Sequence, residues 1–165
     1  MRLFTHILTS LIHWDISANI GAMELINIFI DKKAAGKLIL AGWKFDWSIS
    51  SGAVSQKIGY FEQEELQGIV EFERVPSSMY NFIYLIELAP WNVGKKKQIH
   101  NVAGTLLAFV AQDSLNAGFD GFVAMQSKTI LEKHYIEKYG ARSIGGGRLV
   151  FDTAASKKLI KQYLR

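Results

Sequence analysis

The sequence predicts a single mixed α/β (α+β) domain, in which a central, mostly antiparallel sheet is flanked by helices. Three observations lead to this prediction. Residues 82–88 (FIYLIEL) form a nearly continuous apolar run, which is typical of a strand buried on both faces. Residues 102–116 place apolar side chains at helical spacing. Residues 122–125 (FVAM) form an apolar run that is too short for a helix and fits a buried strand.

The remaining elements follow from apolar patterns and turn residues. Residues 24–33 are apolar and fit either a strand or a helix, whereas residues 66–74 (LQGIVEFER) alternate as a half-buried strand does. The other elements are expected in this order: a helix over 32–40 ending near Gly42, a strand over 53–61, a turn over 63–65, a loop over 76–78, a helix over 128–139 between an N-cap at Ser127 and Gly140, a turn over 145–147, a strand over 148–151 and a basic helix over 153–164.

Length and composition limit the classes of protein to which the chain can belong. With 165 residues, 49% of them apolar, it is large enough for one domain with its own core. It contains no cysteine, which excludes disulfides, thiolate metal ligands and a cysteine nucleophile. The four histidines do not have the spacing of metal ligands with a carboxylate nearby, so we expect no metal site.

The N-terminal segment, residues 1–22 (MRLFTHILTSLIHWDISANIGA), fits no targeting signal. His6, His13 and Asp15 interrupt its apolar stretch, and no small-residue cleavage site follows. We expect residues 1–22 to be an extension, either disordered or preceding the true start at Met23, and residues 23–165 to form the single domain. Without a targeting signal or an apolar run long enough to cross a bilayer, a cytoplasmic location is predicted.

Positive charge gathers at the C-terminal end. Residues 128–165 contain nine Lys or Arg and three Asp or Glu, which suits an anionic partner. The basic helix also has apolar residues, at Leu159, Ile160, Tyr163 and Leu164, which favour packing on the sheet. No basic and aromatic residues interleave as in single-strand binding proteins, so we predict neither nucleic acid nor membrane as a partner.

The stretch KKKQIHNVAG, residues 95–104, joins the apolar strand to the helix that begins near Val102. The first turn of a helix leaves backbone N–H groups unpaired and carries partial positive charge, so it can bind phosphate oxygens. Small residues at Ala103 and Gly104 would let a diphosphate approach the backbone. The alternative is a surface helix preceded by solvated lysines.

These residues resemble the GCN5-related N-acetyltransferase (GNAT) superfamily, in which a buried strand, a loop with the motif Q/R-x-x-G-x-G/A and an amphipathic helix follow one another. Residues 98–103 (QIHNVA) match the motif with Asn101 in place of its first glycine, and asparagine is tolerated at the positive φ that a glycine adopts. Residues 118–123 and 134–141 are similar to the family's later turn and helix. Residues 87–92 (ELAPWN) are similar to the E-x-A-P-x-N loop of a bacterial subgroup, and the likeness spans about residues 68–151.

The resemblance implies a GNAT-like acyl-CoA N-acyltransferase fold with acetyl-CoA as co-substrate. It implies transfer of an acetyl group to a primary amine of a small molecule or peptide, by direct attack in a ternary complex. A homodimer is compatible with the family. The residues expected to hold acetyl-CoA are Leu88, Ala89, Lys96, Lys97, Gln98, Ile99, His100, Asn101, Val102, Ala103, Gly104 and Thr105.

Glu87 is the best candidate for the general base of such a reaction, because it is a carboxylate in an otherwise apolar strand beside the expected thioester. The alternative is a carboxylate with a structural role. Glu71 and Glu73 lie on the preceding strand and share one face by alternation. They could recognise a cationic substrate or relay a proton, or simply belong to a polar face.

The other chemical roles are assigned from the resemblance. A backbone N–H near Leu88 or Ala89 is expected to stabilise the oxyanion. The family commonly protonates the leaving thiolate with a tyrosine at the position that Ile136 occupies here, so we predict Tyr135 as the acid, with water or no acid as alternatives. Because Asn101 and Ile136 depart from the family pattern, a non-catalytic acyl-CoA-binding or protein-interaction module is the second hypothesis.

Overall fold

The structure is a computed structural model that describes residues 15–20 by their backbone and residues 23–164 in full. Residues 1–14 and 21–22 of the predicted extension therefore lie outside the described residues. Residues 15–20 form a strand that pairs antiparallel with the next one. In the described part of the chain, no helix has the length and apolarity needed to cross a membrane.

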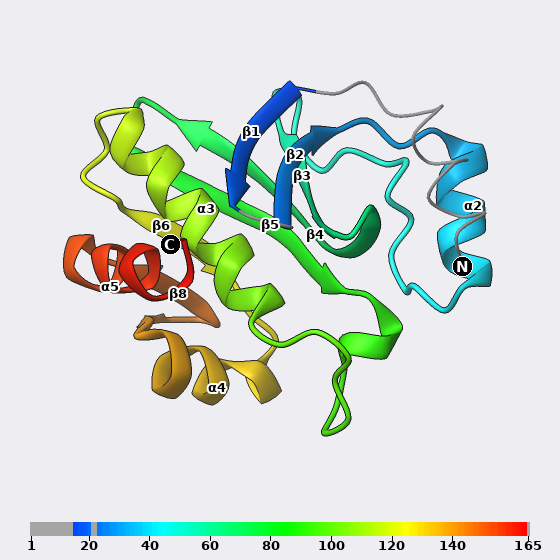
Figure 1. Cartoon of the computed structure of the whole chain (residues 1–165). Helices are drawn as coiled ribbons and strands as arrows, with labels where there is room; N and C mark the ends of the chain where they lie inside the picture. Colours follow the sequence, from blue (N-terminus) through cyan, green and yellow to red (C-terminus); the bar gives the residue numbers. More distant parts are fainter. Residues whose placement is uncertain (1–14, 21–22, 165) are drawn as a thin grey trace.

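The described residues build one eight-stranded sheet (Figure 1). Its strands lie in the order β1-β2-β3-β4-β5-β6-β8-β7, and every pair is antiparallel except β5 and β6. The strands are β1 (Asp15–Ile20), β2 (Met23–Ile28), β3 (Gln56–Glu62), β4 (Glu65–Val75), β5 (Tyr80–Leu88), β6 (Val123–Gln126), β7 (Arg142–Gly145) and β8 (Arg148–Phe151).

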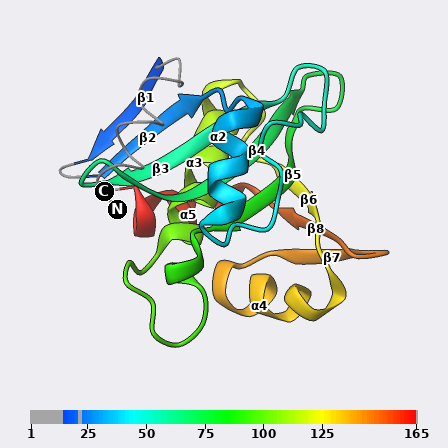
Figure 2. The ribbon, with the colours of Figure 1, turned by 90° about the vertical axis from the view of Figure 1, so that its right-hand side faces the viewer.

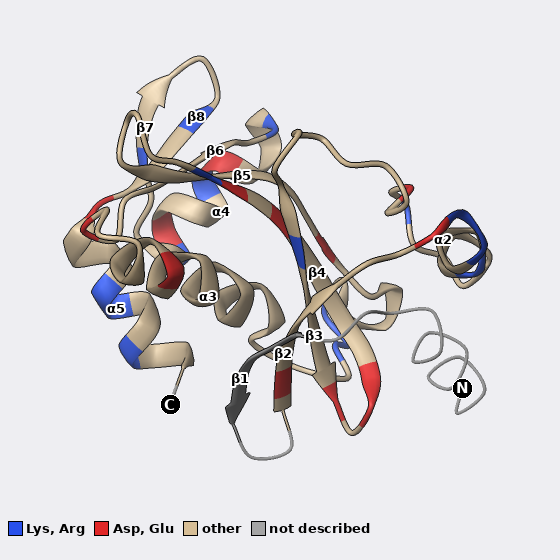
Figure 3. Ribbon diagram, turned by 90° about the horizontal axis from the view of Figure 1, so that it is seen from above, with Lys and Arg blue, Asp and Glu red and all other residues tan. Residues whose placement is uncertain are grey.

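Helices lie on both faces of this sheet. Figure 3 shows α3 and α5 on one face and α2 on the other. The helices of the described residues are α2 (Lys32–Leu40), the 3-10 turn η1 (Pro90–Asn92), α3 (Val102–Asn116), α4 (Thr129–Tyr139) and α5 (Thr153–Tyr163). Asp31 caps α2 and Asp152 caps α5, each accepting a hydrogen bond from a first-turn N–H at 2.8 and 2.9 Å.

Each face has its own apolar core. Val70 and Phe72 of β4 pack towards α3, α4 and α5, while Leu66 and Ile69 pack with α2 and with Trp43 and Trp47 of the following loop. Residues 66–72 of β4 are therefore buried on both faces, and the expectation of a half-buried strand was wrong. The alternating pattern misled because the polar residues that alternate with the apolar ones are themselves buried by the α2 side of the molecule.

The opposite correction applies to β5. It was expected to be buried on both faces, but residues 84–88 are only half-buried. These residues extend past the last residue that β6 pairs with, which is Ile83, so one edge of the strand has no neighbouring strand.

The α3 bounds, residues 102–116, are those predicted, and Gly140 ends α4 in the left-handed conformation with φ +80°. Ser127 does not cap α4, because its N–H donates to the carbonyl oxygen of Gly147 and its hydroxyl to that of Lys128. Strand β7 was not predicted, since its residues RSIG are all exposed and carry no apolar pattern.

Gly68 of β4 lies where the start of α3 approaches the sheet, and replacing it with alanine is expected to destabilise the fold. A Cβ there would lie 2.7 Å from Val102 Cγ1 and 3.2 Å from the carbonyl oxygen of Glu87. Overpacking of this kind costs about 1–3 kcal/mol, so Gly68→Ala should lower the free energy of unfolding in urea by that amount. Gly36→Ala in α2 is the matched control, because a Cβ there meets no atom within 4 Å and should stabilise the helix by up to about 1 kcal/mol. Equal stability of Gly68→Ala and the wild type would contradict the close packing.

Candidate active site

The candidate site begins where β5 and β6 part. Parallel pairing joins Asn81–Ile83 of β5 to Val123–Met125 of β6, and β5 then continues alone to Leu88. The register of β5 against β4 shifts at the same point, since Phe72 pairs with Ile83 and Glu71 with Leu85, leaving Tyr84 as the extra residue of a bulge. A strand edge without a neighbour therefore faces an opening between the two strands.

The backbone of this edge offers one clear donor. The N–H of Ala89 donates to the carbonyl oxygen of Gln67 at 2.9 Å, so the prediction that Ala89 supplies an oxyanion donor does not fit the hydrogen bonding. Successive N–H groups of a strand point to opposite sides. The N–H of Leu88 consequently points away from β4 and into the opening.

A buried polar network holds the loop that follows β5. Asn92, which is fully buried, donates to both the carbonyl and side-chain oxygens of Gln67 at 3.2 and 2.8 Å, and Trp91 Nε1 donates to the Gln67 side chain at 2.9 Å. The Asn92 side-chain oxygen accepts the N–H of Ile99 at 2.9 Å. Sequence reasoning missed Gln67 and treated Asn92 only as part of a motif. Together they fix both ends of the segment that carries Lys95, Lys96 and Lys97.

Asn101 adopts the left-handed conformation, with φ +67° and ψ +16°, directly before α3. The sequence analysis anticipated this positive φ from the tolerance of asparagine for it. The Asn101 side chain makes no capping hydrogen bond, while its carbonyl oxygen accepts the N–H and hydroxyl of Thr105 at 3.0 and 2.8 Å. The first-turn N–H groups of α3 are thus left without a side-chain cap, as an anion site at a helix start requires.

The predicted cofactor residues fall into three groups by exposure. The exposed ones are Lys96, Gln98, His100 and Asn101; the half-buried ones are Leu88, Lys97, Ile99 and Ala103; the buried ones are Ala89, Val102, Gly104 and Thr105.

Gly104 is small for a reason other than the one expected. A Cβ on it would lie 2.6 Å from the ring of Tyr163, so the space beside Gly104 is filled by α5. The packing of α3 against α5, rather than the approach of a diphosphate, explains this glycine.

Glu87 is fully engaged by the loop between α2 and β3. Its carboxylate accepts the N–H groups of Lys44 and Phe45 at 2.5 and 3.1 Å and the indole N–H of Trp47 at 2.8 Å. A carboxylate has about four acceptor positions, so three are filled from one side. This arrangement matches the structural alternative stated for Glu87 and leaves little of the carboxylate to receive a substrate proton.

Two further carboxylates of β4 hold the same loop. Glu71, fully buried, accepts the N–H and hydroxyl of Ser51 at 2.9 Å each and the hydroxyl of Ser55 at 2.6 Å. Glu73 accepts the N–H of Val54 at 3.3 Å and the hydroxyl of Tyr84 at 2.9 Å. Glu71, Glu73 and Glu87, here called the carboxylate row, thus hold residues 44–55 against the sheet.

Lys57 of β3 belongs to the same region. It is buried, and its ammonium donates to the carbonyl oxygen of Trp47 at 2.7 Å. Burial lowers the pKa of Lys57, while the negative charges of Glu71 and Asp46 act in the opposite direction. The lysine supports the loop and partly balances the carboxylate row.

Tyr135 of α4 is buried in the core that α3 and α5 share. Burial raises the pKa of its phenol, so the hydroxyl stays protonated at neutral pH, as a proton donor must be. Ile136, at the position where the family has its tyrosine, is 38% exposed and points away from this core. The predicted role of Tyr135 therefore remains a prediction with a compatible protonation state.

Figure 2 shows the loop that carries the lysines beside α4. The charges of Lys97 and Lys138 act on His134, whose pKa is lowered first by partial burial and then by these two cations. Three cationic or titratable side chains from the loop and α4 thus gather near the start of α3. Among the described residues, no group of three or more His, Cys, Asp or Glu could hold a metal ion.

Comparisons with known proteins bear on the fold. No family model and no curated protein matches the sequence. A CoA-dependent acyl-homoserine lactone synthase, BjaI, solved with SAM and isopentyl-CoA, matches with a TM-score of 0.51 at 10% sequence identity, covering 72% of this chain and 69% of that chain. The GNAT-like fold predicted from the sequence is confirmed.

Two further solved structures match this chain. GCN5 of Tetrahymena has a TM-score of 0.45 at 6% identity, covering 60% of this chain and 68% of that one. Nourseothricin acetyltransferase has a TM-score of 0.41 at 14% identity, covering 59% of this chain and 62% of that one, so the match spans less than two thirds of the acetyltransferase.

His134 gives the fold a pH dependence with a defined sign. Because its pKa is lower in the folded chain than the ordinary 6.5, the unfolded chain binds the proton more readily, and stability should fall as the pH drops from above 6.5 through the lowered value. Unfolding in urea at several pH values should show this loss in the wild type and a smaller one in His134→Gln. Identical pH profiles of the two proteins would contradict the lowered pKa.

Proposed function

We propose that this protein is an acyl-CoA-dependent N-acyltransferase that transfers the acetyl group of acetyl-CoA to a primary amine of a small molecule or peptide. The observation that carries the proposal is the left-handed Asn101, which starts α3 with its first-turn N–H groups uncapped, beside the opening where β5 leaves β6. A backbone donor for an acyl oxygen and an anion site for a diphosphate then lie at the two ends of one loop.

The residues present fit a CoA group. The pyrophosphate would be held by the N–H groups of Val102 and Ala103 and by the positive end of α3. Lys96, which is exposed, and Lys97, which is half-buried, would add positive charge near it. Bound acetyl-CoA would supply an activated acyl thioester whose carbonyl carbon an amine can attack.

The chain would contribute three functions to such a transfer. The N–H of Leu88 would donate to the acyl oxygen as it gains negative charge. The neutral hydroxyl of Tyr135 would provide a proton for the departing sulfur. The amine must lose its proton to a carboxylate or to water, and Glu87 is the predicted base.

One observation favours the non-catalytic alternative. The three N–H donors on Glu87 give it a structural task, and Ile136 supplies no phenol at the family position. An acyl-CoA-binding module would keep the loop and α3 but would need neither Glu87 nor Tyr135 for its function.

Calorimetric titration with acetyl-CoA and with desulfo-CoA tests the loop directly. We expect both to bind the wild type, because the nucleotide and diphosphate are common to them. Replacing Lys96 and Lys97 with alanine and Asn101 with valine should weaken binding by at least about tenfold, since charged hydrogen bonds and the left-handed turn are lost together. Asn101→Gly is the matched control and should bind like the wild type. Absence of binding to either nucleotide would refute the transferase proposal and the binding-module alternative alike.

Kinetics of Tyr135→Phe and Glu87→Gln distinguish transfer from simple binding. With a screen of acceptor amines, Tyr135→Phe should lower kcat by about 10²-fold with the KM for acetyl-CoA unchanged, because only the proton donor is removed. Glu87→Gln should lower both kcat and thermal stability, since the loop at residues 44–47 loses acceptor capacity. A wild-type chain that binds acetyl-CoA but acetylates no amine would favour the binding module.

A further inference from the structure

The face of β5 that is turned away from α3 carries aromatic side chains. Asn81 donates to the carbonyl oxygen of Val110 in α3, and Ile83 lies in the core beneath that helix, so Tyr80 and Phe82 point to the opposite face by alternation. Figure 3 shows α2 covering only the β2–β4 end of that opposite face. Phe82 and Tyr84 stack edge to face there, with ring centroids 5.0 Å apart.

Glu73 differs from the other two members of the carboxylate row. Glu71 and Glu87 each accept three hydrogen bonds from the loop. Glu73 accepts a single loop N–H, at the long distance of 3.3 Å, and the hydroxyl of Tyr84. It is only half-buried, so about two of its acceptor positions remain for another donor.

The loop leaves room above this pair of residues. A Cβ on Gly52 would lie 2.8 Å from both Glu73 Oε1 and the Tyr84 hydroxyl, and glycine keeps that space free. The hydrogen bond to Glu73 raises the pKa of Tyr84, which keeps the phenol protonated and the negative charge on Glu73. A half-buried carboxylate with spare acceptor capacity next to aromatic rings is suited to a primary ammonium group.

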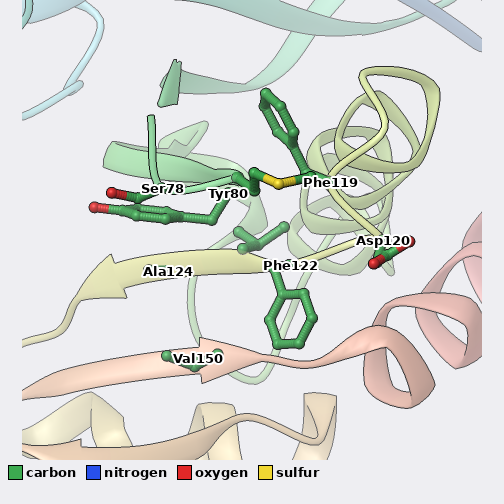
Figure 4. A pocket seen from close by; sticks show the side chains of 9 residues that line it. Ser78, Tyr80, Phe119, Asp120, Phe122, Ala124 and Val150 are labelled. Carbon is green, nitrogen blue, oxygen red and sulfur yellow. The ribbon is translucent and has the colours of Figure 1, made fainter. Parts of the chain in front are cut away.

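A pocket of about 330 Å³ lies on the same face, close to this carboxylate. Figure 4 shows that Tyr80, Phe122, Ala124 and Val150 line it, and Asp120 lies at its rim. Glu73 pairs with Phe82 and Phe82 with Ala124, so the three residues form one row across the sheet. At about 4.8 Å between strands, the pocket wall at Ala124 is about 10 Å from Glu73.

From this arrangement we infer that the acceptor is a primary amine carried on a compact apolar body. Glu73 and Tyr84 bind the ammonium group, and the pocket at Tyr80, Phe122, Ala124 and Val150 receives the apolar body. The inference rests on the proposed function for the word acceptor, but the amine site itself is built from residues that the acyl-CoA loop does not share. Glu73, rather than Glu87, is then the carboxylate that meets the substrate.

Calorimetry with 2-phenylethylamine as the probe tests this site on the full chain, with and without desulfo-CoA. We expect the amine to bind in at least one of the two conditions. 2-Phenylethanol, which lacks the ammonium group, and propylamine, which lacks the ring, should each bind at least about tenfold more weakly, because each satisfies only half of the site. Glu73→Gln should weaken 2-phenylethylamine about 10- to 100-fold, since the charged partner of the ammonium is lost.

Two further variants separate the site from folding. Ala124→Leu should fill the pocket and weaken 2-phenylethylamine while leaving propylamine unchanged. Glu64→Gln, the same chemical change at an exposed turn, should bind like the wild type, and thermal unfolding of every variant verifies that it is folded. The inference is overturned if 2-phenylethylamine fails to bind in both conditions, if 2-phenylethanol binds equally well, or if a folded Glu73→Gln binds like the wild type. Loss of acetyl-CoA binding alone would refute the proposed function without touching the amine site.

Discussion

The short parallel contact between β5 and β6 is the constraint on which the candidate site depends. Three residue pairs join the two strands, and the bulge at Tyr84 follows at once. If the pairing continued to Leu88, the amides of that edge would be used within the sheet and no backbone donor would face an opening. The loop, the left-handed Asn101 and α3 are all placed by where β5 goes after it leaves its neighbour.

The two sides of the opening are held in different ways. On the side of α3, the buried amides of Gln67 and Asn92 tie the loop to β4 and leave the lysines at its tip in solvent. On the side of α2, ionisable groups do the work, because the carboxylate row receives N–H and hydroxyl donors from residues 44–55. Neutral amides suit the place where an anion would bind, and carboxylates suit the place where a cation would.

Local signals in the sequence predicted much of the fold but less of the site. The apolar spacing of residues 102–116 gave α3 its bounds, and the residue type of Asn101 indicated its positive φ, because both depend on neighbouring residues only. The role of Glu87 could not be obtained in this way, since its partners lie 40 to 43 residues earlier in the chain. Strand β7 escaped for a related reason: its pairing with β8, not its own side chains, makes it a strand.

The carboxylate row holds the loop at residues 44–55 largely by backbone N–H groups, those of Lys44, Phe45, Ser51 and Val54. Every residue except proline presents such a group, so most substitutions at these four positions would keep the loop in place. The scaffold is thereby separated from the chemistry of the loop's exposed side chains. Related chains could diversify these side chains, and with them the molecules they select, without rebuilding the sheet beneath.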